Sequence, residues 1–497
     1  MGPRQFQLGV QNFLKKFKYQ NAVTADLWRE FEALDSTDLP VSDIMDTWTK
    51  QMGYPVLNVE RLTDNRYRLT QTRYLRSQNQ TYNASVSPYG YSWDVPVTWV
   101  SSASPDTASL AWLKRNESEL RLQFPNGTTW VKFNVGQRGF YRVNYPAADW
   151  TGLAALLRNR PGALSPADRA SLLNDAFSLA ESGHLAYDVP LEMTSYLGQE
   201  TNLVPWQTVY SKLFSLRRLL EFTPAYPLLN AYIRDLVGDH YARLGWRDEG
   251  THAEKLTRND IIALACASGV KACTEQAVEL FNAWLADPTV FISPDFKTAV
   301  LKNGIAASGA NFDTWNTVFQ RTVKEANAQE KKKLWSALAK SKEPWILSRY
   351  ISLAANETIV RSQDYFAVLS YISANPVGNP LVWEYLQDNW PALVHRFSLN
   401  DRYLGRLPKA IVSDFASPFK LDQVKQFFAR YIYLFLCIYL FAYLFFYPSF
   451  ACMYVCMYVC MCLICVYIFI HPSIYSSVIY LCIYVSIYLP PQLSISV

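Results

Sequence analysis

The distribution of charge divides this chain into two parts that must be considered separately. Every Asp, Glu, Lys and Arg lies at or before Arg430, and residues 431–497 contain none. The first part mixes positive and negative residues, 47 Lys and Arg against 42 Asp and Glu, without long blocks of one sign. This mixture argues against a nucleic-acid-binding arm or a polybasic membrane patch. We therefore expect no nucleic-acid partner.

The uncharged tail, residues 431–497, contains a four-residue repeat. The segment MYVCMYVCM at 453–461 has the period that arises when a repeating TATG tetranucleotide is read in triplets, which gives Tyr-Val-Cys-Met. We predict that the tail is translated repetitive DNA, such as an intron read as coding sequence, and is not part of the folded protein. Its length and lack of charge also permit one or two membrane spans. A membrane protein anchored by its C-terminal tail is therefore the alternative.

The first 145 residues change hydrophobic period at a Gly-Pro boundary. Residues 1–53 have apolar side chains at helical spacing, and Thr24 is placed to cap the second helix. Residues 54–145 change to period two, which predicts antiparallel strands with one buried face. A segment of about this length suits a small β-sandwich. The alternation is clearest in Trp93, Val95, Val97 and Trp99.

Residues 146–430 are helical in pattern throughout. The segment Ser165-Pro166-Ala167-Asp168 combines an N-cap, a proline at the first helical position and an acid in the first turn. Many paired helical patterns follow, which predicts a curved α-solenoid with a concave surface. The expected fold is thus multi-domain α+β, a small antiparallel β-sandwich followed by a large all-α superhelical domain of the HEAT or armadillo type.

Cysteines and sequons favour an extracellular protein. Cys266 and Cys273 are the only cysteines before the tail. They could close a small disulfide loop, which contributes about 2.5 kcal/mol in the chain-entropy model, or remain two buried thiols. Five N-x-Ser/Thr sequons support an oxidising compartment, and the clustering of four of them predicts one glycan-bearing surface. The sequon residues are Asn79, Asn83, Asn116, Asn126 and Asn356.

The motifs of catalysis are missing from the sequence. The chain has five histidines and no H-E-x-x-H, so no helix offers two zinc ligands one turn apart with a glutamate base. It also has no G-x-S-x-G elbow, P-loop or dinucleotide fingerprint. We therefore identify no catalytic residue and no metal ligand in this chain. The N-terminus carries no signal peptide, and we expect that the true N-terminus is missing.

Three sequence blocks resemble the M1 family of zinc aminopeptidases. MDTWTKQMGYPVLNV, residues 45–59, resembles the junction that closes the catalytic domain of that family. GFYRVNY, residues 139–145, resembles the end of its small β-domain. SPADRASLLNDAFSLA, residues 165–180, resembles the first helices of its large C-terminal domain. The pair Cys266 and Cys273 falls where the family commonly has a disulfide.

The resemblance implies a domain order. Residues 1–53 would be the last helices of the catalytic domain, residues 54–145 the β-sandwich domain, and residues 146–430 the helical C-terminal domain. The family's zinc helix H-E-x-x-H and its G-x-M-E-N exopeptidase motif would precede residue 1. The resemblance therefore implies zinc in the intact family, and none bound by this chain, which would be inactive alone. It also implies a plasma-membrane ectoenzyme or secreted protein, and a possible homodimer.

One substrate residue is implied by the resemblance. The segment WPALVHRFSLNDRYLGR, residues 390–406, is similar to the members of the family that remove acidic N-terminal residues. Arg402 matches the arginine that meets the acidic side chain of their peptide substrate. A guanidinium suits this role, since it stays charged and binds a carboxylate in bidentate geometry. The alternative for Arg402 is a surface or intramolecular ion pair with a neighbour such as Asp401. The alternative for the chain is a non-catalytic peptide-binding or scaffold module.

Overall fold

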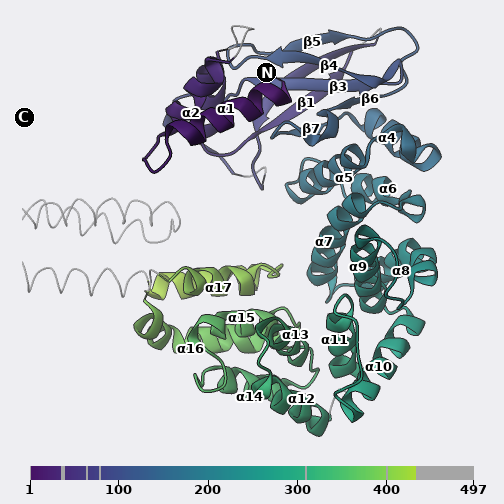
Figure 1. Ribbon diagram of the computed structural model, residues 1–497, viewed down its shortest axis with the longest axis vertical. Coiled ribbons are helices and arrows are strands. Elements are labelled where there is room, and N and C mark those ends of the chain that lie inside the picture. The colour runs from purple at the N-terminus through teal and green to yellow at the C-terminus, as the bar shows by residue number, and fades with distance from the viewer. Residues whose placement is uncertain are drawn as a thin grey trace, which may run out of the picture. The chain divides into compact units, whose positions relative to one another are not determined.

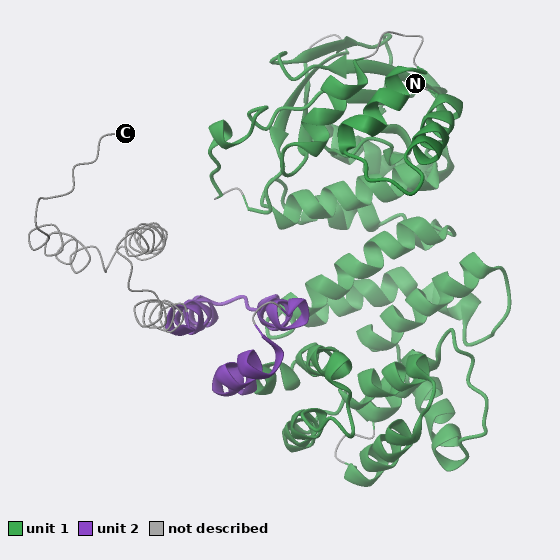
Figure 2. Ribbon diagram, turned by 60° about the vertical axis from the view of Figure 1, so that its left-hand side comes forward, with its two compact units in different colours: residues 1–382 green, residues 383–497 purple. Residues whose placement is uncertain are grey.

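The computed structural model describes residues 2–34, 40–62, 65–77, 80–307, 311–398 and 401–431. The chain separates into two compact units, residues 1–382 and 383–497 (Figure 2). The first unit contains three N-terminal helices, two β-sheets and a long series of helices (Figure 1). The second contains most of helix α16, helix α17 and a further helical segment, residues 418–431.

The N-terminal helices form a small apolar core of their own. They are α1 (Pro3–Lys16), α2 (Thr24–Glu32) and α3 (Val41–Thr49). Trp28, Phe31 and Val41 are buried together, and the Phe6 ring stacks on Phe31 at 5.2 Å between centroids. The predicted N-cap at Thr24 is wrong by one residue. Val23 precedes the helix, and its backbone N–H donates to the Asp26 carboxylate at 2.9 Å, so that an acid in the first turn replaces the cap.

Two sheets follow. The first has the order β5-β2-β1-β7 and the second has the order β4-β3-β6. The strands are β1 (Pro55–Arg61), β2 (Arg66–Arg73), β3 (Val95–Ser101), β4 (Ser104–Leu113), β5 (Leu120–Gln123), β6 (Val131–Phe133) and β7 (Arg142–Asn144).

Buried aromatic side chains lie between these sheets. The Tyr67 ring on β2 meets Phe133 on β6 at 6.2 Å and Phe124 at 5.2 Å, both edge to face. The expectation of purely antiparallel strands is wrong at one place, because β7 pairs with β1 in parallel. A parallel pair requires a long crossover, and the excursion of the chain through the second sheet supplies it.

The helices after β7 contact one another in a regular order. They are α4 (Ala147–Asn159), α5 (Pro166–Glu181), α6 (Asp188–Thr194), α7 (Leu203–Leu220), α8 (Ala225–Leu244), α9 (His252–Ser268), α10 (Lys271–Ala286), α11 (Lys297–Ala307), α12 (Phe312–Lys324), α13 (Ala328–Leu338), α14 (Pro344–Ala354) and α15 (Ser362–Ser373). Helix α5 packs against α7, α7 against α9, α9 against α11, α11 against α13, and α13 against α15. Short 3-10 turns lie at Ala84–Val86, Val135–Gln137, Pro161–Ala163 and Leu197–Gln199.

The second unit has an aromatic core. Trp383 on α16 (Gly378–Phe397) contacts Phe427 at 5.2 Å, and Trp390 contacts Tyr431 at 6.1 Å. Tyr431 is buried, and its hydroxyl donates to the Gln387 carbonyl at 3.0 Å. Tyr431, the first residue of the predicted tail, thus takes part in a buried cluster. Residues 432–497, the remainder of the predicted tail, lie outside the described residues.

Candidate functional site

Two buried ion pairs join helix α5 to the sheets. The Lys132 ammonium on β6 lies 2.9 Å from the Asp168 carboxylate, and both side chains are almost fully buried. The Arg142 guanidinium on β7 lies 3.0 Å from the Asp175 carboxylate. Asp168 and Asp175 are two helical turns apart and so lie on one face of α5. The helix begins as predicted, because the Ser165 hydroxyl accepts the Asp168 N–H and Pro166 takes the first position.

The same carboxylates hold the loop between the two sheets. The Gly136 N–H donates to Asp168 at 2.7 Å, and the Val143 N–H donates to Asp175 at 3.0 Å. Asn134 and Gln137 have left-handed backbones, with φ of 60° and 54°. Such conformations are strained for residues other than glycine and persist where the surroundings fix them. The Asn134 amide fixes this loop by donating to the carbonyls of Gly139 and Tyr141.

The pKa values of Asp168 and Asp175 are shifted in opposite directions. Burial would raise the pKa of Asp168, but the Lys132 ammonium and the Ser165 hydroxyl hold it below its ordinary value. Burial raises the pKa of Asp175 to about 6, and the opposing attraction of Arg142 only partly offsets that effect. The fold therefore favours the ionised form of Asp168, whereas burial makes Asp175 easier to protonate than an ordinary carboxyl.

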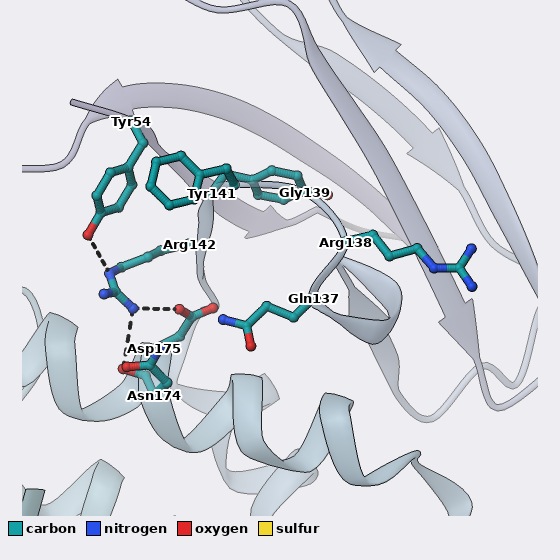
Figure 3. Close-up of a pocket in the computed structure, with 9 residues that line it drawn as sticks. Tyr54, Gln137, Arg138, Gly139, Tyr141, Arg142, Asn174 and Asp175 are labelled. Atoms are coloured by element: carbon teal, nitrogen blue, oxygen red, sulfur yellow. Dashed lines mark hydrogen bonds and ion pairs between the residues drawn. The ribbon is translucent and has the colours of Figure 1, made fainter. Parts of the chain in front are cut away.

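A pocket of about 230 Å³ opens beside Asp175 (Figure 3). The guanidinium of Arg142 donates to the Tyr54 hydroxyl at 3.3 Å and lies over the Tyr74 ring at 4.9 Å. Its charge is already balanced by Asp175, so the pocket is polar but internally neutralised. The lining residues include no nucleophile paired with a base. The arrangement therefore suits the binding of a small polar group and the attachment of α5 to the sheets. The lining residues are Tyr54, Gln137, Arg138, Gly139, Phe140, Tyr141, Arg142, Asn174 and Asp175.

Sequence reasoning missed this junction. Arg142 lies in the block GFYRVNY, and Asp168 and Asp175 lie in the block SPADRASLLNDAFSLA. In the sequence analysis these blocks indicated only a family resemblance. The seven-residue spacing of Asp168 and Asp175 was a usable signal, since two acids on one helical face next to apolar neighbours need cationic partners. The identity of those partners requires the fold.

Arg402 is placed differently. It is the first residue of α17 (Arg402–Val412) and is exposed. The predicted alternative, an ion pair with Asp401, is not what the structure shows, because the Asp401 carboxylate caps α17 by accepting the N–H groups of Tyr403 and Leu404. The Arg402 guanidinium donates to the Tyr403 hydroxyl at 3.0 Å. Among the described residues, no carboxylate forms an ion pair with it.

Cys266 and Cys273 are joined by a disulfide that connects the end of α9 to α10. The carbonyls that follow Cys266 are held by arginines. Arg217 donates to the carbonyl of Ala267, and Arg234 donates to that of Ser268 at 2.7 Å. Cationic groups at a helix C-terminus satisfy its unpaired carbonyls and complement the helix dipole. The disulfide thus belongs to a locally fixed helix end.

The described sequon asparagines are exposed. They are Asn83, Asn116, Asn126 and Asn356, while Asn79 lies outside the described residues. Their positions leave room for glycans, which remain a prediction.

No metal site is found in the described ranges. No group of three or more His, Cys, Asp and Glu residues there could hold a metal ion. The described residues therefore do not fit the zinc ion that the resemblance implies for the intact family. We derive no chemical step through zinc. In the same ranges, no single helix is long and apolar enough to cross a membrane; only α9 and α10 taken together, with a 106° bend between them, meet that criterion.

Comparison with known proteins identifies the class. Residues 130–433 match the ERAP1-like C-terminal domain family, and residues 1–48 match the Peptidase family M1 domain. The chain therefore belongs to the family of ERAP1-like C-terminal domains, and its sequence is that of the C-terminal portion of an M1 aminopeptidase. This confirms the family resemblance of the quoted blocks.

The similar proteins include glutamyl aminopeptidases. The chain is 39% identical over 433 residues to glutamyl aminopeptidase of Sus scrofa, which covers 86% of this chain and 45% of the relative. It is 38% identical over 433 residues to glutamyl aminopeptidase of Homo sapiens, with 86% and 44% covered. It is 29% identical over 447 residues to thyrotropin-releasing hormone-degrading ectoenzyme of Rattus norvegicus, with 87% and 42% covered. The chain thus spans less than half the length of these relatives.

Proposed function

We propose that this chain is the C-terminal region of a zinc metalloaminopeptidase that removes acidic N-terminal residues from peptides. The observation that carries the proposal is the similarity to glutamyl aminopeptidases across 86% of the chain. Zinc and catalysis would be supplied by an M1 catalytic segment upstream, since the chain has no H-E-x-x-H. The chain alone would then bind no zinc and hydrolyse no peptide.

In this proposal Arg402 recognises the acidic side chain of the substrate. Its exposed guanidinium is free of any carboxylate partner among the described residues, as a substrate-binding cation should be. A planar guanidinium can form two parallel hydrogen bonds to a carboxylate. The neighbouring Tyr403 hydroxyl, which accepts one of its N–H groups, orients it. Neutral substrates would gain little from this group.

The helical region would provide the frame for that recognition. The regular packing of every second helix from α5 to α15 supports a superhelical domain, the predicted residues 146–430, with a surface for a peptide or another domain. One relative is named as an ectoenzyme, which supports an extracellular location for the intact protein. Attachment to the plasma membrane or secretion, glycans on the sequons and a possible homodimer are further parts of the proposal. A non-catalytic peptide-binding or scaffold module is the alternative for the chain alone.

The test joins this chain to the upstream half of the Sus scrofa glutamyl aminopeptidase. The joined protein should contain about one zinc per chain and release glutamate from a chromogenic substrate, whereas the chain alone should do neither. In the joined protein, Arg402→Gln should lower kcat/KM for the glutamate substrate by about 30-fold or more, the cost of removing one partner of a buried charge pair. The alanine substrate should be nearly unaffected.

The control substitution is Arg406→Gln, one turn further along α17, which removes the same charge from another exposed position. Equal losses of kcat/KM for glutamate and alanine substrates with Arg402→Gln would contradict the role of Arg402. Zinc-dependent hydrolysis by the chain alone would contradict the proposal that an upstream segment supplies zinc and catalysis. Binding of an acidic peptide by the chain alone, with no activity after joining, would favour the scaffold alternative.

A further inference from the structure

Gln137 has a strained backbone at the edge of the pocket beside Asp175. Its φ of 54° lies in the left-handed region, which costs free energy for a residue other than glycine. The loop around it is fixed, because the Gln137 N–H donates to the Asn134 carbonyl at 3.0 Å and the Gly136 N–H donates to Asp168 at 2.7 Å. Strained positions of this kind cluster where proteins hold ligands. The fold therefore sets the direction in which the Gln137 side chain leaves the loop.

The Gln137 side chain points across the pocket without a partner. Figure 3 shows its amide directed toward the Asp175 carboxylate, and both residues line the same cavity of about 230 Å³. In the part of the chain that the structure describes, the Gln137 side-chain amide forms no hydrogen bond, with Asp175 or with any other group. The pocket thus places a donor and an acceptor on facing sides of a space that a bound group can fill.

Asp175 has capacity for one more donor. Its Oδ1 accepts from Arg142 at 3.0 Å and its Oδ2 accepts from the Val143 N–H at 3.0 Å. A carboxylate oxygen can accept more than one hydrogen bond. Burial raises the pKa of Asp175 to about 6, so the group is still mostly ionised at neutral pH. Because Asp175 is only 5% exposed, a ligand N–H would satisfy an acceptor that water reaches poorly.

The charge balance of the pocket favours an uncharged ligand. Arg142 already neutralises Asp175, so an additional buried ion of either sign would lose its hydration without a free counter-charge. The edge of the pocket is apolar, since the Phe140 ring is 70% exposed and lies 4.9 Å from the Tyr54 ring, centroid to centroid. The complementary ligand is a neutral group that both donates and accepts hydrogen bonds and has an apolar part beside it.

We propose that this pocket binds a primary carboxamide, whose N–H donates to Asp175 and whose carbonyl accepts from the Gln137 amide. The apolar part of the ligand would pack on Phe140. The carboxamide can come from two sources, a free small molecule or the side chain of Asn or Gln in a peptide. The site includes neither Arg402 nor a metal, so it does not rest on the proposed aminopeptidase function.

The first experiment measures the binding of benzamide to the full chain at neutral pH by ligand-observed NMR titration. Two analogues serve as controls, benzoate, which is charged, and N,N-dimethylbenzamide, which has no N–H. Each should bind at least about tenfold more weakly than benzamide, because benzoate brings an unpaired charge and the dimethyl compound leaves Asp175 without its donor. Equal binding of benzamide and either analogue would overturn the proposal.

Substitutions locate the binding. Gln137→Met keeps the length of the side chain but removes its amide, and should weaken benzamide binding by about tenfold. Phe140→Ala removes an exposed ring outside the core, and should weaken binding by about threefold or more. The matched control is Gln329→Met, the same substitution at an exposed position of α13, which should leave binding unchanged. Tryptophan fluorescence checks that each variant is folded.

Peptides distinguish the two sources of the carboxamide. Acetylated Ala-Gln-Ala and Ala-Glu-Ala differ only in whether the side chain ends in a carboxamide or a carboxylate. Binding of the Gln peptide but not of the Glu peptide would assign the pocket to a peptide side chain, whereas binding of benzamide alone would assign it to a free carboxamide. Should Gln137→Met fail to fold, hydrogen exchange of the unsubstituted chain replaces it, and benzamide should slow exchange at residues 136–143 but not in α13. No binding of benzamide, or binding that neither substitution weakens and that protects no residue of 136–143, would overturn the proposal.

Discussion

The junction between α5 and the sheets and the start of α17 both carry cations, but those cations have different partners. At the junction, Lys132 and Arg142 each have a carboxylate within about ion-pair distance, at 2.9 and 3.0 Å. At the start of α17, the exposed Arg402 guanidinium donates to the Tyr403 hydroxyl and has no carboxylate partner among the described residues. A buried cation with a protein partner connects two elements of the fold. An exposed cation without a carboxylate partner should contribute little to stability, and this difference can be tested by substitution.

The largest expected effect is at Lys132. Lys132→Met should lower the free energy of unfolding by about 3–5 kcal/mol, because it leaves the Asp168 carboxylate buried and unpaired. The double substitution Lys132→Met with Asp168→Asn should recover part of this loss, since no isolated charge remains. Chemical denaturation monitored by tryptophan fluorescence measures both.

The matched control for Lys132 is Lys50→Met, which breaks the exposed pair with Asp46. We expect no resolvable loss there, because exposed ion pairs contribute little. A loss at Lys132 no larger than that at Lys50 would mean that the junction does not depend on its buried pairs.

The next effect is the pH dependence of the free energy of unfolding. The contributions of Asp175 and Asp168 to it have opposite signs. The pKa of Asp175 rises from an ordinary 3.8 to about 6 in the folded state. Between these values the folded chain holds more protons than the unfolded chain, so stability due to Asp175 falls as pH rises. Over this window the decrease is about 3 kcal/mol at 1.36 kcal/mol per pKa unit. Relative to the unsubstituted chain, Asp175→Asn should therefore gain stability between pH 4 and pH 7.

Asp168 provides the internal control for this sign. Its pKa is held below the ordinary value, so its ionised form stabilises the fold, and that contribution is lost as pH falls through the lowered pKa. Asp168→Asn should consequently lose stability relative to the unsubstituted chain at pH 7, with a smaller difference in acid. Denaturation curves at several pH values for the two variants measure these slopes. Slopes of the same sign would contradict the opposite pKa shifts of the two carboxyl groups.

A smaller effect is expected at the disulfide between Cys266 and Cys273. Replacing both Cys266 and Cys273 by serine should lower stability by about 2.5 kcal/mol, the loop-closure value for so short a loop. A reducing agent should produce the same loss in the unsubstituted chain and none in the double variant. If α9 keeps its end without the disulfide, because Arg217 and Arg234 hold its carbonyls, the loss will fall short of this value.

The sequence predicted local structure better than long-range partners. The start of α5 followed from Ser165 and Pro166, and the strand β3 followed from alternating apolar residues, because both depend on neighbouring positions. The parallel pairing of β7 with β1 could not be predicted, since it joins Val56 to Arg142 across the second sheet. The partners of Asp168 and Asp175 were also missed, because Lys132 and Arg142 lie more than 30 positions away in the sequence. Arg402 was identified by resemblance alone, and the structure adds its exposure and the capping role of Asp401.

The smallest expected effect is at Arg402, the exposed cation that has no carboxylate partner among the described residues. Arg402 occupies the first position of α17, where the positive end of the helix dipole disfavours a cation by about 0.3–1 kcal/mol. Arg402→Gln should therefore leave stability unchanged or raise it slightly. Lys409 lies in the last turn of the same helix, where a cation is favoured, so Lys409→Gln should lower stability by a similar amount. Thermal denaturation at low salt compares the two, and the difference should shrink at high salt because exposed charges are screened. A loss of more than about 1 kcal/mol with Arg402→Gln would show that Arg402 supports the fold. A neutral or stabilising result would show that the guanidinium is not required there for stability, as a residue that serves a ligand should behave.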